Sequence, residues 1–155
     1  LLPGAPAEMR SVRCPRGLPM KLSRAIPALP VTRIDKAVAF YADRLGFRAA
    51  HVDDSFAVLT RDDVELHLWA SNDDSWRSRS LGEHPIVSGA ETFLAGTASC
   101  RVQVDDLDAL YDEYSHADVL YAADTTITSR EWGERDFPVL DLHRNLLTFF
   151  EQIDP

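Results

Sequence analysis

Cysteine is scarce in this chain, which has two among its 155 residues, Cys14 and Cys100. The two lie far apart in the sequence, so they indicate neither a disulfide framework nor a metal motif. Basic residues are also outnumbered, with 16 Lys and Arg against 25 Asp and Glu and a formal net charge of −9 at pH 7. This charge disfavours nonspecific attraction to nucleic acid or to an anionic membrane surface, and it favours a cationic ligand.

A long hydrophobic run is missing too, since no apolar stretch approaches the ~20 residues needed to cross a bilayer. Hydrophobic residues make up 45% of the chain and charged residues 26%, the ordinary balance of a soluble globular protein. A chain of this length suits one domain, or two small modules that share a core. Because we interpret the cysteines as reduced thiols, we expect a cytoplasmic protein. The negative net charge and the lack of a long apolar stretch predict neither a membrane partner nor a nucleic-acid partner.

The first 19 residues show neither helical nor strand periodicity, and they carry four prolines and three arginines. We therefore expect residues 1–19 to be a poorly ordered leader, with Met20 as a plausible natural start. The segment also lacks the apolar core of a secretory signal. Residues 20–155 are expected to form a single domain.

An amphipathic helix is the clearest element in the first half of the chain. Thr32 stands at the expected N-cap with Asp35 three residues later, and Gly46 suits the left-handed closing position. The apolar positions at helical spacing are Ile34, Ala37, Val38, Tyr41 and Leu45. The preceding segment, 25–31, holds two prolines, which favour an edge strand because proline cannot donate to a sheet ladder. Strands are predicted at 47–52, 56–60 and 64–69.

The second half of the chain repeats the first at an offset of 73 residues, from Ile34 to Leu107 and from Tyr41 to Tyr114. The same offset carries the cap position from Thr32 to Asp105. Around the second helix, the sequence predicts strands at 99–104, 119–121 and 125–128 and a β-hairpin at 130–151. The predicted fold class is α+β, with two βαβββ modules at about 22–70 and 98–152. A long polar linker, 71–97, joins them.

Strand alternation places a mixed set of aromatic and polar side chains on common faces of the predicted strands. The set comprises Glu65, His67, Trp69, Ser99, Arg101, Gln103 and Thr148. Aromatic surface combined with a few hydrogen-bonding groups is typical of a small-molecule site. Stacking and cation–π contacts in such a site suit a flat or cationic ligand.

Four segments carry a resemblance to a known family. They are RIDKAVAFYADRLGF in the first module, and SCRVQVDDLDALYDEY, EWGERDFPVLD and NLLTFFE in the second. With two βαβββ modules, the chain resembles the glyoxalase and bleomycin-resistance superfamily, also called the vicinal oxygen chelate fold, from Leu22 to about Gln152. Within it, the Trp-Gly turn followed by an aromatic-bearing strand is most similar to the small bleomycin resistance proteins.

The resemblance implies a test for metal chemistry. Enzymes of this superfamily hold a metal with four ligands, typically His, Gln and Glu, on strands of both modules. The matching positions here are approximately Ile26, His67, Ser99 and Thr148. Only His67 is a strong ligand, and serine and threonine hydroxyls do not replace the missing carboxylates and imidazoles. We therefore expect no metal site, no cofactor and no catalytic residue.

Drug-binding members use the cavity as a cleft between two subunits. There, aromatic rings stack on planar parts of the antibiotic and acidic groups meet its cationic tail. Phe56 and Trp132 match family stacking positions, whereas Trp69 and Arg101 depart from the family pattern. The expected ligand-binding residues are Phe56, His67, Trp69, Ser99, Arg101, Gln103, Trp132 and Thr148.

The resemblance thus implies a strand-exchanged homodimer that sequesters a bleomycin-family antibiotic without chemistry. One alternative is a metal-dependent glyoxalase-like lyase or dioxygenase of the same fold. Another alternative is a carrier or sensor of a different small molecule.

Several residues have a structural interpretation as well. A single histidine on a half-buried strand, such as His67, is more often a hydrogen-bonded packing residue than a ligand. Glu131 and Glu134 flank the Trp-Gly turn, where charges are usually solvated, and Cys100 is expected to be an inert buried thiol. The turn 141–145 lacks the proline and glycine common in the superfamily, so no role is transferred to it.

Overall fold

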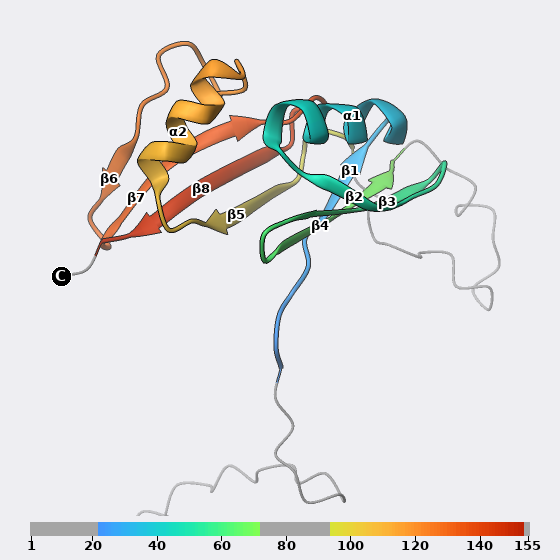
Figure 1. Cartoon of the computed structure of the whole chain (residues 1–155), viewed down its shortest axis with the longest axis horizontal. Coiled ribbons are helices and arrows are strands. Elements are labelled where there is room, and N and C mark those ends of the chain that lie inside the picture. Colours follow the sequence, from blue (N-terminus) through green and yellow to red (C-terminus); the bar gives the residue numbers. More distant parts are fainter. Residues whose placement is uncertain (1–21, 72–93, 154–155) are drawn as a thin grey trace, which may run out of the picture.

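The computed structural model describes residues 22–71 and 94–153. Within them, the chain forms two four-stranded sheets, each with one helix, which confirms the α+β class (Figure 1). The predicted leader, 1–19, and most of the predicted linker, 71–97, lie outside the described residues.

The first module has the order strand, helix, and three strands. Its elements are β1 (Ala28–Val31), α1 (Ile34–Leu45), β2 (Arg48–Val52), β3 (Phe56–Arg61) and β4 (Val64–Ala70). The sheet order is β1-β4-β3-β2, with β1 parallel to β4 and the other pairs antiparallel. β1 is thus an edge strand, as the prolines of 25–31 predict.

The second module repeats this topology. Its elements are β5 (Ser99–Gln103), α2 (Leu107–His116), β6 (Thr128–Arg130), β7 (Glu134–Leu140) and β8 (Leu146–Gln152). The sheet order is β5-β8-β7-β6, and β5 runs parallel to β8 just as β1 runs parallel to β4. The two βαβββ modules and the closing hairpin are therefore confirmed.

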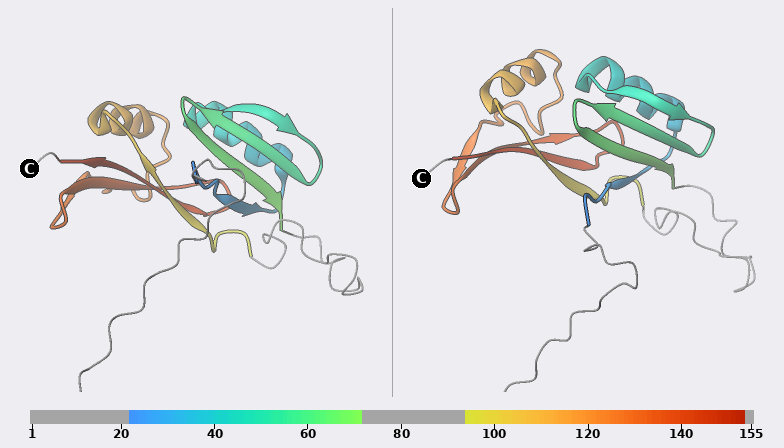
Figure 2. Two further views of the ribbon diagram at one scale, coloured as in Figure 1. Left: turned by 90° about the horizontal axis from the view of Figure 1, so that it is seen from below. Right: turned by 60° about the horizontal axis from the view of Figure 1, so that its bottom comes forward.

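Both helices lie on the same side of the molecule, and each covers one face of its sheet (Figure 1). Turning the molecule brings the strands of the first module in front of α1 (Figure 2). The buried faces of the sheets and helices form one core, in which Tyr41 and Tyr114 are fully buried. The opposite faces of the sheets carry the polar and aromatic side chains that alternation predicts.

The 73-residue repeat extends to the contacts of its tyrosines. The Tyr41 hydroxyl donates to Asp141 Oδ2 at 3.1 Å, and the Tyr114 hydroxyl donates to the Leu45 carbonyl at 3.1 Å. Each tyrosine hydroxyl therefore donates to a residue of the other module. Burial raises the pKa of both phenols, well above the ordinary value for Tyr41, so both remain donors.

Three predicted details are wrong. The N-caps are Arg33 and Asp106, one residue after the predicted Thr32 and Asp105, and only Asp106 makes a side-chain capping bond, from Ala109 N–H. The predicted strand 119–121 is reduced to a single bridge at Leu120. The predicted strand 125–128 begins only at its last residue, because β6 spans Thr128–Arg130.

The turn 141–145 has a structural role that its divergent sequence did not predict. Asp141 Oδ1 accepts from the backbone N–H groups of His143 and Asn145, each at 2.8 Å. The fully buried Asn145 side chain donates to the Pro30 carbonyl at 2.8 Å and accepts from Gly96 N–H at 3.1 Å. The turn therefore fastens the hairpin to β1 of the other module.

Gly46→Ala is expected to destabilise the protein by more than the strain of placing alanine at a positive φ. Gly46 closes α1 at φ 71°, and a Cβ there would lie 2.8 Å from Nη1 of Arg61, which donates to the Leu45 carbonyl. We expect a loss of about 1–2 kcal/mol in the free energy of unfolding, measured by urea denaturation.

Gly133→Ala is the matched control for this substitution. Gly133 has φ 84°, but the nearest atom to an added Cβ is 3.9 Å away. It carries a similar backbone strain without the collision. Equal losses for the two variants would contradict a steric role for Arg61.

Candidate ligand-binding faces

Three predicted residues form an aromatic cluster on the open face of the first sheet. Phe56 on β3 lies opposite Trp69 on β4, and their ring centroids are 4.4 Å apart at 44°. The His67 ring meets Phe56 edge-on, with centroids 5.0 Å apart at 89°. All three side chains are partly exposed, because the alternate residues of both strands face the core. We call Phe56, His67 and Trp69 the aromatic cluster.

His67 is also tied to its neighbours by polar contacts. Its Nε2 lies 3.0 Å from Glu65 Oε1, and the other oxygen of that carboxylate accepts from Arg24 at 3.0 Å. His67 is therefore hydrogen-bonded and packed, as expected for a single histidine on a half-buried strand. The contact with Glu65 restrains the imidazole beside the Phe56 ring.

The predicted residues of the second module centre on Trp132. Trp132 is 65% exposed as a residue, and its Nε1 donates to Glu134 Oε2 at 2.8 Å. Arg101 Nη2 donates to the same oxygen at 2.6 Å, and Gln152 Nε2 donates to Oε1 at 2.7 Å. The prediction that Glu134 is solvated is therefore wrong, because these contacts leave it 7% exposed, whereas Glu131 is exposed as predicted.

Arginines neutralise the carboxylates on this face. The hydrogen bond from Arg101 is the main cause that lowers the pKa of Glu134, followed by the one from Trp132. Arg130 binds the buried Asp136 with two hydrogen bonds, of 2.8 and 2.7 Å. The Arg101 guanidinium also lies 4.3 Å from the centroid of the Phe150 ring. These paired acids offer little free charge to a cationic tail.

The remaining predicted residues lie on the same face of the second sheet. Thr148 on β8 is opposite Arg101, and Ser99 and Gln103 are exposed on β5 to either side of it. The structure thus brings the predicted residues together as two groups, one on each module. Among residues 22–71 and 94–153, no hydrogen bond, ion pair or ring contact joins the two groups.

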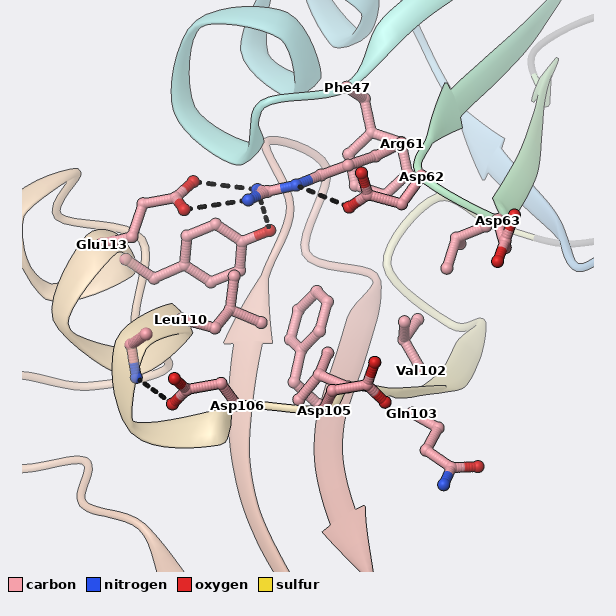
Figure 3. A pocket seen from close by; sticks show the side chains of 15 residues that line it. Phe47, Arg61, Asp62, Asp63, Val102, Gln103, Asp105, Asp106, Leu110 and Glu113 are labelled. Atoms are coloured by element: carbon pink, nitrogen blue, oxygen red, sulfur yellow. Dashed lines mark hydrogen bonds and ion pairs between the residues drawn. The ribbon is translucent and has the colours of Figure 1, made fainter.

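A separate cavity of about 440 Å³ lies between the modules, on the side of α2. Arg61 reaches across it to the Glu113 carboxylate at 2.8 and 2.9 Å and to the Tyr114 hydroxyl at 3.2 Å (Figure 3). Gln103 is the only predicted site residue in its lining. Arg61 lies between the predicted strands 56–60 and 64–69, and the sequence does not predict this contact, because a pattern within one module cannot reveal a partner in the other.

The described part of the chain contains no group of three or more His, Cys, Asp or Glu side chains that could share a metal ion. Nor does it contain a helix long and apolar enough to span a membrane. Cys100 is a free, partly buried thiol, and burial raises its pKa to about 11. This pKa keeps the thiol protonated at neutral pH, which agrees with the predicted inert role.

Residues 24–149 match the Glyoxalase/Bleomycin resistance protein/Dioxygenase superfamily. The chain belongs to this superfamily.

The chain is also similar to individual proteins named for a role in drug resistance. The chain is 47% identical over 130 residues to a bleomycin resistance protein of Geobacillus stearothermophilus. The matched residues cover 84% of this chain and 97% of the relative. The predicted resemblance to bleomycin resistance proteins is therefore confirmed.

Two solved structures share the fold. A bleomycin resistance determinant encoded on the transposon Tn5 is 24% identical, with a TM-score of 0.63 and coverage of 84% of this chain and 98% of that one. A bleomycin-binding protein from Streptomyces verticillus, complexed with copper(II)-bleomycin, is 25% identical, with a TM-score of 0.62 and coverage of 88% and 99%.

Proposed function

We propose that this protein confers resistance by binding and sequestering an antibiotic of the bleomycin family, without converting it chemically. The observation that carries the proposal is the 47% identity to a bleomycin resistance protein along nearly the whole of that relative. The exposed Trp132 and the partly exposed aromatic cluster support it, since both offer ring faces to a planar ligand group.

Both groups of residues contact the ligand, the aromatic rings by stacking and the polar side chains by hydrogen bonds. Phe56 and Trp69 on one module, and Trp132 on the other, stack on flat parts of the antibiotic. Ser99, Gln103 and Thr148 supply hydrogen bonds beside them. Because the carboxylates near Trp132 are paired with arginines, the cationic tail is attracted mainly by the overall charge of −9.

A homodimer would complete the site. Within the described residues of one chain, no hydrogen bond, ion pair or ring contact joins the aromatic cluster to the predicted residues of the second module, which are Ser99, Arg101, Gln103, Trp132 and Thr148. In a cleft between two subunits, the first module of one copy faces the second module of the other, and one ligand meets both groups. The proline-containing edge strand β1 is the segment suited to exchange between the copies. Sedimentation of the free protein tests this assembly.

The donor set argues against the enzymatic alternative. At the four positions that correspond to metal ligands, Ile26, Ser99 and Thr148 offer no carboxylate or imidazole, and His67 is already bonded to Glu65. We therefore propose no cofactor and no catalytic residue. A stoichiometric divalent metal in freshly purified protein would contradict this part of the proposal.

Calorimetric titration of the whole protein with bleomycin tests the function directly. We expect binding with a Kd of about 1 μM or tighter, and growth of an expressing strain at drug concentrations that stop the control strain. Spermidine is the control for attraction by charge alone, and it is expected to bind far more weakly. Absence of binding at micromolar bleomycin, together with absence of protection, would refute the proposal.

A further inference from the structure

The buried carboxylate of Glu134 joins side chains from separate elements of the second sheet. Arg101 comes from β5, Gln152 from β8, and Trp132 from the turn between β6 and β7. Their three donors use both carboxylate oxygens, at 2.6, 2.7 and 2.8 Å. Glu134 itself stands at the start of β7, directly opposite Gln152. The carboxylate is therefore a junction within the sheet and not a solvated surface charge.

We propose that Glu134 is a positioning residue that fixes the Trp132 indole in the orientation in which its ring receives the ligand. The inference rests on the proposed function, because it assigns the ligand contact to Trp132. The contact itself is made by the indole, and Glu134 acts only through it.

Trp132 needs such support because of where it stands. It lies in the short turn between β6 and β7, and 65% of it is exposed. The Arg130 guanidinium lies 5.9 Å from its ring centroid and is itself held by Asp136. An exposed aromatic side chain that is free to change rotamer loses that freedom on binding, which weakens affinity. The hydrogen bond to Glu134 removes the freedom before the ligand arrives.

The carboxylate is itself held in place. Arg101 neutralises it with a charge-assisted bond of 2.6 Å, and Arg101 is held in turn by the Phe150 ring at 4.3 Å. A glutamine at position 134 has one acceptor oxygen and an NH₂ group, so it cannot accept from all three donors at once. Glu134→Gln thus loosens the junction while it preserves the size of the side chain.

The ionisation of Glu134 sets the pH range over which this junction holds Trp132. Because Arg101 and Trp132 lower its pKa below the ordinary value of 4.5, the carboxylate is charged throughout the neutral range. Because the pKa of Glu134 is lower in the folded protein than in the unfolded one, the stabilisation by its carboxylate is complete above the unfolded-state pKa. It is lost as pH falls through the folded-state pKa. The junction is therefore expected to hold Trp132 from neutral pH down to below about 4.5. Its hydrogen bonds are expected to weaken only in more acidic solution.

The test compares Glu134→Gln with Glu131→Gln, a neighbouring glutamate of the same turn that is exposed. Nitrogen-15 NMR of the ligand-free protein follows the indole N–H signals of the three tryptophans, with Trp132→Phe used to assign the signal of Trp132. We expect Glu134→Gln to shift that signal and speed its exchange with water. Glu131→Gln is expected to leave it unchanged.

Calorimetry with bleomycin measures the consequence for binding. Glu134→Gln is expected to weaken affinity roughly tenfold, whereas Glu131→Gln should stay within about twofold of the unchanged protein. Thermal unfolding identifies any variant that fails to fold. Arg101→Gln, which removes the charged partner and leaves the carboxylate, provides a second way to loosen the same junction.

The outcomes separate this inference from the function on which it rests. If the unchanged protein does not bind bleomycin, the proposed function fails, and the indole signal of the free protein still decides whether Glu134 positions Trp132. If the unchanged protein binds and Glu134→Gln binds equally well with an unshifted indole signal, the positioning role is overturned while the proposed function stands.

Discussion

Replacement of Asn145 by alanine is expected to lower the free energy of unfolding by about 3 kcal/mol. The side chain is fully buried and bonds to Pro30, Asp141 and Gly96. Its loss would leave the Pro30 carbonyl and the Gly96 N–H without these partners, and each unsatisfied buried group costs about 1–3 kcal/mol. It would also release one side of the contact between the closing hairpin and β1. Urea denaturation measures the change.

Leu142→Ala is the control in the same turn. Leu142 is 48% exposed, so its removal is expected to cost less than about 0.5 kcal/mol. If the two variants were equally stable, the buried hydrogen bonds of Asn145 would make no net contribution to stability. The m-value should stay constant in both, because a change would indicate an altered denatured state.

Replacement of Phe56 by alanine is expected to weaken bleomycin binding about 100-fold, on the scale of a central aromatic anchor. The ring packs against Trp69 at 4.4 Å and against the His67 ring at 5.0 Å, so its loss removes one stacking surface and frees the other two rings. Calorimetry at neutral pH measures the change in affinity.

Phe56→Leu separates stacking from packing. Leucine keeps most of the apolar volume and lacks the π face, so we expect stability near that of the unchanged protein with affinity still reduced at least tenfold. Unchanged affinity in the leucine variant would mean that Phe56 supports the cluster only as apolar bulk. In that case, Trp69 would become the stacking residue to test.

Most of the fold was predictable because it depends on local periodicity. Helical spacing and the alternation in β4 are each visible within one short window of sequence, and the recurrence of Tyr41 as Tyr114 is visible when two such windows are compared. The exact helix starts were not, because an N-cap is defined by backbone geometry. Arg33 takes the capping position in an extended conformation without a side-chain capping bond, and adjacent Asp105 and Asp106 look alike in sequence.

The candidate site was predictable only as far as strand alternation extends. Alternation and the family resemblance identify Phe56, His67 and Trp69 as candidates, and the structure brings them into contact. The junction at Glu134 was missed because Arg101 precedes it by 33 residues and reaches it across the sheet. Such a pairing depends on the register of β5 on β8 and of β8 on β7, which the separate strands do not reveal.

The exchanged contacts of Tyr41 and Tyr114 bear on the ancestry of the chain. A half-length ancestor with one such tyrosine, assembled as a pair about a two-fold axis, would have formed the same contact twice. Once the two copies were fused, each contact could change by itself. Here one tyrosine donates to a carboxylate and the other to a backbone carbonyl. The two helices thus carry their tyrosines at matching positions, while the groups that accept from those tyrosines differ.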